Sequence, residues 1–246
     1  PELLDIAGAV DIVNFREAIS DRGEDYDIAF IEGSIITPHD VKRIKEIRSK
    51  AKVLVALGAC AHTGGLNKLR NFQDTEEAKK EVYGDDARNF EVLPKVLAVG
   101  EVVPVDLAIP GCPINRFEFI SVVKQVLAGV KPVIPNYPVC VECKLNENEC
   151  LMLQGKICLG PITLAGCDSR CINNAWPCTG CRGLVDKPHL EADQITLSKA
   201  GLTVQDILRK YGPGVEIEVD YPEAHFTLAS NMDDVTVEDI IAEFSL

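Results

Sequence analysis

The chain has 246 residues, ten cysteines and a formal charge of −13 at pH 7, and these values exclude several classes of protein. A chain of this length builds its own core, so its cysteines are not expected to form the disulfide framework of a small secreted domain. An acidic chain without a basic run interleaved with aromatics is not expected to bind nucleic acid. No stretch approaches the roughly 20 apolar residues of a membrane span, and we expect a cytoplasmic protein.

The first third of the chain contains several apolar runs typical of strands. The chain starts at Pro1 without an initiator Met or a signal-like stretch, so we expect further residues upstream. Residues 10–15 alternate between apolar and polar and predict a strand. Residues 27–33 and 52–58 are mostly apolar runs that end in glycine, and residues 105–109 form a shorter run. These three predict strands buried on both faces.

Segments with helical periodicity alternate with these predicted strands. Apolar residues recur at helical spacing in residues 39–49 and again in residues 117–127, while residues 74–86 predict a charged surface helix. Strands that alternate with helices indicate a parallel sheet covered on both faces. We therefore predict an α/β fold for residues 1–135, a doubly wound parallel sheet of the flavodoxin type.

The ends of the predicted strands carry candidate site residues. Glu32 ends the first buried strand, Cys60 follows the second in Gly-Ala-Cys-Ala, and Cys112 follows the third in Pro-Gly-Cys-Pro. Sites in such sheets form beyond the carboxyl ends of the strands, so the two thiols are expected to share a site. Glu32 is a candidate for a proton or water path there, or alternatively a helix-capping or surface acceptor.

The remaining eight cysteines crowd into residues 140–181, after a linker with three prolines at residues 132–138. Thiols at this density serve as crosslinks or metal ligands, and soft thiolates in multiples of four suit zinc or iron-sulfur clusters. The spacings are irregular rather than those of a zinc ribbon, and glycines stand beside the thiols, where a cluster needs close backbone approach. We predict a small, loop-rich iron-sulfur domain over residues 136–185.

Two further features follow this segment. Arg182 stands beside the last cysteine and is a candidate to offset the negative charge of thiolate-bound iron, or alternatively an ordinary surface Arg. Residues 186–246 contain two predicted helices, at 203–211 and 237–244, around an alternating segment at 215–219. We expect this C-terminal extension to act as scaffold or as a partner contact.

Several motifs resemble the small subunit of nickel-iron hydrogenases. They are Ile-Glu-Gly-Ser at 31–34, Gly-Ala-Cys-Ala-His-Thr-Gly-Gly at 58–65, Pro-Gly-Cys-Pro at 110–113, Cys-Leu-Gly-Pro-Ile-Thr-Leu-Ala-Gly-Cys at 158–167, and Trp-Pro-Cys-Thr-Gly-Cys-Arg-Gly at 176–183. The all-cysteine version is similar to cytoplasmic multisubunit enzymes, in particular archaeal sulfhydrogenases and the F420-non-reducing type. The resemblance covers residues 9–184 and implies a flavodoxin-like domain followed by a cluster domain.

The resemblance implies three [4Fe-4S] clusters. Cys60 and Cys112 would hold a proximal cluster together with an N-terminal C-x-x-C pair, which is absent here and which we expect upstream of Pro1; its loss is the other possibility. Family order assigns a distal cluster to Cys140, Cys143, Cys150 and Cys158, and a medial cluster to Cys167, Cys171, Cys178 and Cys181. The respiratory enzymes have histidine at the place of Cys140, and proline with a three-iron cluster at the place of Cys171. An exchange that joins Cys181 to Cys140, Cys143 and Cys150 stays open.

The resemblance also implies the function. The chain would be a non-catalytic subunit that relays electrons, reversibly, between H2 oxidation at a large [NiFe] subunit and a flavin- or iron-sulfur-containing partner. One alternative is the respiratory complex I subunit of the same ancestry, which has a single cluster and lacks the eight-cysteine extension. Another alternative is a zinc-stabilised interaction protein without a redox role.

Overall fold

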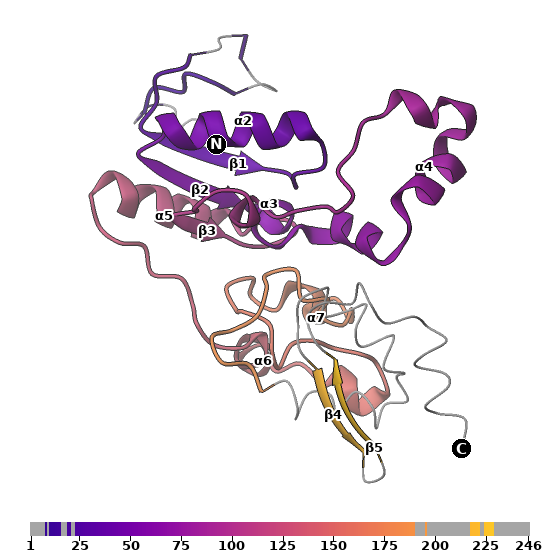
Figure 1. Cartoon of the computed structure of the whole chain (residues 1–246). Helices are drawn as coiled ribbons and strands as arrows, with labels where there is room; N and C mark the ends of the chain where they lie inside the picture. Colours follow the sequence, from indigo (N-terminus) through magenta and orange to yellow (C-terminus); the bar gives the residue numbers. More distant parts are fainter. Residues whose placement is uncertain are drawn as a thin grey trace.

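The computed structural model of the chain has two parts joined by an extended linker (Figure 1). The first, which we call the sheet part, spans residues 23–130, and the second, the cysteine-rich part, spans residues 138–186. Residues 130–137 between them contain no helix or strand, as expected of a linker. The described residues are 8, 10–15, 19–20, 23–189, 195, 217–221 and 224–228.

The sheet part is built on three parallel strands in the order β1-β2-β3. Strand β1 (Ile28–Glu32) pairs with β2 (Val53–Leu57), which pairs with β3 (Leu107–Ile109). Helix α2 (Pro38–Lys50) connects the first two strands, and α5 (Arg116–Leu127) follows the third. The predicted strands at 27–33, 52–58 and 105–109 and the helices at 39–49 and 117–127 are therefore confirmed.

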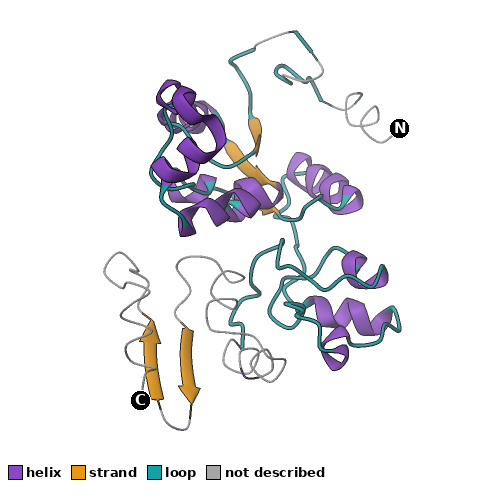
Figure 2. Ribbon diagram, turned by 90° about the vertical axis from the view of Figure 1, so that its right-hand side faces the viewer, coloured by secondary structure: helices purple, strands orange, loops and turns teal. Residues whose placement is uncertain are grey.

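Helices cover both faces of this sheet (Figure 2). Leu54 and Ala56 of β2 pack with Ile44 of α2 on one face. The intervening Val55 points to the opposite face and packs with Val122 of α5. Leu54 and Val55 both have no exposed surface, which explains why β2 reads as an unbroken apolar run rather than an alternating one. The doubly wound architecture is thus confirmed.

The start of α2 is fixed by a capping box. The Thr37 hydroxyl accepts a hydrogen bond from the backbone N–H of Asp40 at 3.1 Å, and the Asp40 carboxylate accepts from the backbone N–H of Thr37 at 2.9 Å. Pro38 occupies the first turn, where no backbone donor is needed. This cap orients the chain as it leaves the carboxyl end of β1, beside the candidate site.

A helical excursion separates β2 from β3. It begins with α3 (Gly58–Thr63) directly at the end of β2, and the predicted surface helix at 74–86 is divided at Gly84, whose φ is +56°. The remaining elements are η1 (Gly65–Phe72), α4 (Thr75–Tyr83), η2 (Gly84–Asn89) and η3 (Val99–Glu101). The excursion projects from the sheet part in Figure 1.

The strand predicted at residues 10–15 is not part of the sheet. Only Asn14 forms an isolated bridge in this stretch. The Val13 carbonyl accepts a hydrogen bond from the backbone N–H of Gly23 at 2.8 Å, and the Asn14 side-chain amide donates to the Gly23 carbonyl at 3.5 Å. The stretch therefore contacts Gly23 and not a strand of the sheet.

The cysteine-rich part has short helices and a small core. Its helices are α6 (Val139–Leu145), η4 (Leu151–Gln154) and α7 (Arg170–Asn173). One buried cluster consists of Val139, Cys143, Leu151, Cys158, Ile172 and Cys178. Leu159, Ile162 and Ala165 are buried as well, so a third of the buried apolar residues of this part are cysteines.

Two short strands are described in the C-terminal extension. Strand β4 (Ile217–Tyr221) pairs antiparallel with β5 (Ala224–Leu228), which confirms extended structure close to the alternating segment at 215–219. The helices predicted at 203–211 and 237–244 lie outside the described residues. Among the residues that the structure describes, no helix is both long enough and apolar enough to cross a membrane.

Candidate iron-sulfur sites

Cys60 and Cys112 lie close together at the carboxyl edge of the sheet. Cys60 lies in α3 after β2, Cys112 follows β3, and the Ala59 backbone N–H donates to the Gly111 carbonyl at 2.9 Å to join the two loops. The pKa of the Cys60 thiol is raised by burial first, then by the neighbouring Cys112 and Glu32. Glu32, at the exposed end of β1, therefore faces the same site.

Close backbone approach shapes this first site. Gly65 has a φ of +57°, and a Cβ at this position would lie 2.9 Å from the Cys60 sulfur. Only glycine leaves the sulfur accessible there, because any side chain would meet the sulfur and would also be strained by the backbone conformation.

A second group of thiols surrounds α6. Cys140 and Cys143 are three residues apart on this helix, and the pKa of the Cys143 thiol is raised chiefly by burial, with further contributions from Cys158 and Cys150. Gly160 lies between two members of the group: a Cβ there would be 3.2 Å from the Cys140 sulfur and 3.5 Å from that of Cys158. The structure therefore gathers Cys140, Cys143, Cys150 and Cys158 in one neighbourhood.

A third group gathers around Cys181. Its thiol pKa is raised by burial and, to a smaller degree, by Cys171. Burial raises the pKa of Cys178 to about 12, with a further small contribution from Cys181, and burial also raises the pKa of Cys167, to which Cys181 again adds. Cys171, on α7, is the exposed member. Cys181 thus lies near Cys167, Cys171 and Cys178, while Cys178 also lies near Cys158 of the second group.

The three groups lie close to one another. The backbone of Cys112 lies near enough to the thiol of Cys181 to lower its pKa, so the first group is near the third. The backbone N–H of Cys178 donates to the Cys158 sulfur at 3.3 Å, so the third group is in contact with the second.

Arg182 is buried, contrary to the alternative of a surface Arg. Only 1% of the residue is exposed, and its guanidinium forms a bidentate ion pair with Glu118 of α5 at 2.7 and 2.9 Å. It nevertheless lies near enough to the thiol of Cys167 to lower its pKa, although burial and Glu142 raise that pKa more strongly. The paired carboxylate of Glu118 therefore offsets much of the electrostatic effect of Arg182 on the thiolates.

Glu142 belongs to the site although its sequence pattern did not single it out. It stands between the two cysteines of the C-V-E-C motif on α6, yet its carboxylate accepts from the backbone N–H groups of Gly166 at 2.7 Å and Ser169 at 3.1 Å. These donors flank Cys167, so Glu142 orders the loop of the neighbouring group. Its position between two candidate ligands was the sequence feature that could have identified it.

The donors present fit iron-sulfur clusters. All ten cysteines lie within the described residues, and none of them forms a disulfide. A cubane takes each thiolate on a separate iron, and buried thiols need such a cation before they ionise.

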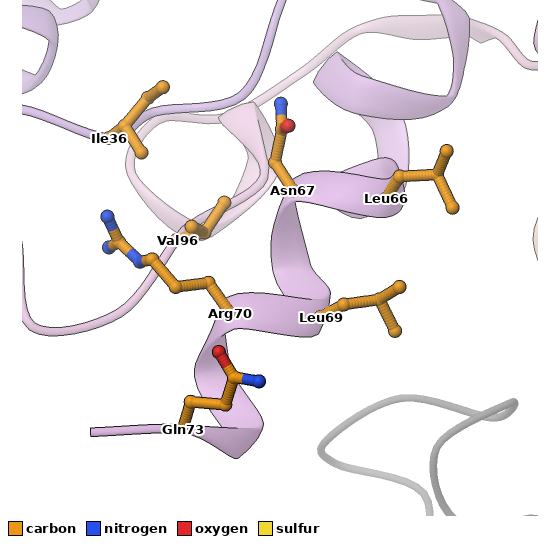
Figure 3. Close-up of a pocket in the computed structure, with 7 residues that line it drawn as sticks. All are labelled: Ile36, Leu66, Asn67, Leu69, Arg70, Gln73 and Val96. Carbon is orange, nitrogen blue, oxygen red and sulfur yellow. The ribbon is translucent and has the colours of Figure 1, made fainter. Parts of the chain in front are cut away.

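A pocket of about 440 Å³ lies away from these thiols, beside η1 (Figure 3). No cysteine lines it, and the Arg70 side chain at its wall donates to the Leu93 carbonyl at 2.7 Å. Its lining residues are Ile36, Leu66, Asn67, Leu69, Arg70, Gln73 and Val96. This lining contains no titratable pair suited to acid-base chemistry, and the candidate chemistry therefore rests on the thiols.

Residues 1–126 match the family described as "NADH ubiquinone oxidoreductase, 20 Kd subunit". The chain belongs to this family. Several of its relatives are hydrogenase subunits: it is 39% identical to "Sulfhydrogenase 2 subunit delta" of Pyrococcus furiosus, an alignment that covers 74% of this chain and 76% of the relative. It is 34% identical to a subunit of the F420-non-reducing hydrogenase vhu of Methanococcus voltae, with 76% and 75% covered.

One solved structure is also similar to this chain. The NAD+-reducing [NiFe]-hydrogenase in its H2-reduced state superimposes with a TM-score of 0.50 and 29% identity, covering 55% of this chain and 82% of that one. The 20 Kd family member described here is therefore of the hydrogenase type, and the resemblance stated from its motifs is confirmed. It is a hydrogenase subunit related to the electron-transfer subunits of [NiFe] enzymes.

Proposed function

We propose that the chain is the electron-transfer subunit of a [NiFe]-hydrogenase and performs no bond-breaking step itself. When bound, three [4Fe-4S] clusters supply a reversible one-electron relay between H2 oxidation in a large [NiFe] subunit and a partner subunit with flavin or iron-sulfur centres. The chain's own residues fix the ligands, exclude water and donate hydrogen bonds to sulfur, which together set the potentials. The relationship to hydrogenase subunits supports this assignment.

The single observation that carries the proposal is the proximity of the three thiol groups. The backbone of Cys112 lies near the Cys181 thiol, and the backbone N–H of Cys178 donates to the Cys158 sulfur at 3.3 Å. A relay needs neighbouring redox centres with intervening protein and little solvent. The buried thiols of Cys143, Cys158 and Cys178 provide this environment between the second and third groups.

The proposal assigns the ten cysteines to three clusters. Cys60 and Cys112 contribute two ligands of the proximal cluster. The distal cluster is held by Cys140, Cys143, Cys150 and Cys158, and the medial cluster by Cys167, Cys171, Cys178 and Cys181. Glu32 lies at the proximal site, where its carboxylate is available for a proton or water path.

A complex I-type subunit with a single cluster is the second candidate, because the family as a whole carries that description. The observation that favours the hydrogenase assignment is the extent of the likeness. The family match ends at residue 126, whereas the alignments with hydrogenase subunits cover 74% and 76% of the chain.

Metal analysis of the full-length protein, purified anaerobically with its partners, tests the proposal. We expect about twelve irons and a matching amount of labile sulfide per chain, together with a copurifying nickel-containing subunit. About four irons without nickel would instead favour the complex I-type subunit with a single cluster. Zinc without sulfide would favour the zinc-stabilised interaction protein. Reduction of the iron-sulfur absorption by H2 is the functional check.

A further inference from the structure

We propose that Arg182 is a positioning residue that sets the separation of the proximal and medial sites. This inference rests on the proposed function but concerns a role other than charge compensation. Arg182 lies at the junction of the two parts of the molecule, because this residue of the cysteine-rich part contacts Pro110, between β3 and α5, and Glu118 of α5.

One guanidinium contacts three cysteine-bearing segments. Arg182 directly follows Cys181 in the chain. Its Nε donates to the carbonyls of Leu164 at 3.1 Å and Ala165 at 2.8 Å, just before Cys167. Its Nη1 donates to the Pro110 carbonyl at 2.8 Å, two residues before Cys112. Movement of any one segment would break a hydrogen bond to the same group.

Glu118 attaches this group to the sheet part. The side chains of Arg182 and Glu118 are 1% and 10% exposed, and both carboxylate oxygens accept from the guanidinium. Glu118 lies on α5, which packs on the sheet through Val122. A planar guanidinium can satisfy this fork and the three carbonyls together, whereas an ammonium group has only three donors.

A second contact from the start of α5 supports the same segment. The Asn115 side-chain amide donates to the Gly166 carbonyl at 2.9 Å, while its Oδ1 accepts from the backbone N–H of Phe117 and caps α5. A Cβ at Gly166 would overlap the Arg182 guanidinium, so the loop packs directly on the ion pair. Residues 110–118 therefore contact the residue before Cys167 and the residue after Cys181, two cysteines assigned to the medial site.

The position of this junction gives Arg182 its role. The electron-transfer rate between two centres falls steeply with their separation, so small displacements of a ligand loop change it strongly. Glu118 compensates the charge of Arg182, so the pair adds little net charge near the thiolates. The pair therefore acts on the proximal and medial sites by fixing their relative positions.

The test uses the complete holoenzyme carrying Arg182→Lys, which keeps the charge but removes the fork. Two reduced, paramagnetic clusters split and broaden each other's electron paramagnetic resonance signals, and this dipolar effect falls with the cube of their distance. We expect Arg182→Lys to weaken the splitting between proximal and medial signals at unchanged iron content. A spectrum identical to that of the wild type would overturn the proposal.

Arg48→Lys is the matched control, because Arg48 also pairs with an acidic residue, Asp106, but within the sheet part. We expect it to leave the splitting unchanged, and an equal loss there would overturn the specific role of Arg182. If Arg182→Lys loses iron, Glu118→Gln decides instead: it keeps one carbonyl oxygen for the guanidinium and removes the second acceptor of the fork that attaches Arg182 to α5. We expect weaker splitting, and unchanged splitting in this variant would overturn the proposal.

The two proposals fail differently. A wild-type holoenzyme without H2-reducible clusters would contradict the proposed function. A wild type with coupled clusters and variants with the same coupling would contradict only the positioning role of Arg182.

Discussion

Gly160 shows how the room at one residue decides whether a site can form. Its position between the sulfurs of Cys140 and Cys158 leaves no space for even a methyl group without displacement of one of them. Unlike Gly65, it has no left-handed backbone conformation, so the restriction at Gly160 is purely steric. The residue can therefore be tested without backbone strain.

We expect Gly160→Ala to lose the distal cluster, about four irons per chain, while the other sites keep theirs. The added methyl would lie 3.2 Å from the Cys140 sulfur and compete with iron for that space. Gly100→Ala is the control, because the nearest atom to its Cβ would be 3.9 Å away, in Val105. Iron and sulfide analysis measures both, and a full iron content in Gly160→Ala would contradict the prediction.

Among the helices and strands, one carboxylate joins three elements. Asp106, just before β3, pairs with Arg48 of α2 and accepts from the backbone N–H of Leu54 in β2 at 2.7 Å. The pKa of Asp106 is lowered chiefly by the hydrogen bond from Arg48. The carboxylate is therefore more stable in the folded chain than in the unfolded one, and it contributes stability above its ordinary pKa of 3.8.

This contribution is lost as the pH falls through the lowered folded-state pKa. We expect Asp106→Asn to lower the free energy of unfolding at pH 7 by up to about 1 kcal/mol, because the pair is partly exposed and the amide oxygen still accepts from Leu54. At pH values well below the ordinary pKa of Asp106, the difference from wild type should disappear. Denaturant unfolding of both iron-free chains at neutral and acid pH measures this, and a difference that persists unchanged in acid would argue against the ion pair as its cause.

Across the molecule, the two parts are stabilised by different means. The sheet part has aliphatic cores on both faces of β2, whereas three of the nine buried apolar residues of the cysteine-rich part are cysteines. Structural metal sites contribute folding free energy directly. We therefore expect the proposed clusters to contribute more to the stability of the cysteine-rich part than to that of the sheet part.

We expect removal of iron by a chelator under reducing conditions to abolish hydrogen-exchange protection in α6 and around Cys178 while β2 and α2 remain protected. The same holoenzyme before chelation is the control, followed by mass spectrometry of exchanged peptides. Equal loss of protection in β2 and in α6 would show that the two parts unfold together, contrary to this expectation.

Local sequence patterns were sufficient to predict the main strands and helices. Buried runs at β1 and β2 and helical spacing in α2 and α5 depend on neighbours in the chain, so they could be predicted. The family motifs likewise depend on residue type and spacing. The strand predicted at 10–15 was wrong because alternation over six residues does not reveal that this stretch pairs with Gly23 and not with the sheet.

The partners of the buried polar residues, by contrast, became known only from the folded chain. Arg182 and Glu118 are 64 residues apart, and nothing local in the sequence distinguishes a buried, paired Arg from a solvated one. The same holds for Glu142, which sits among one set of thiols and orders the loop of another, and for the contact of Cys112 with Cys181. The reason is physical: secondary structure follows from interactions a few residues apart, whereas burial and pairing follow from packing of segments that the chain order does not place together.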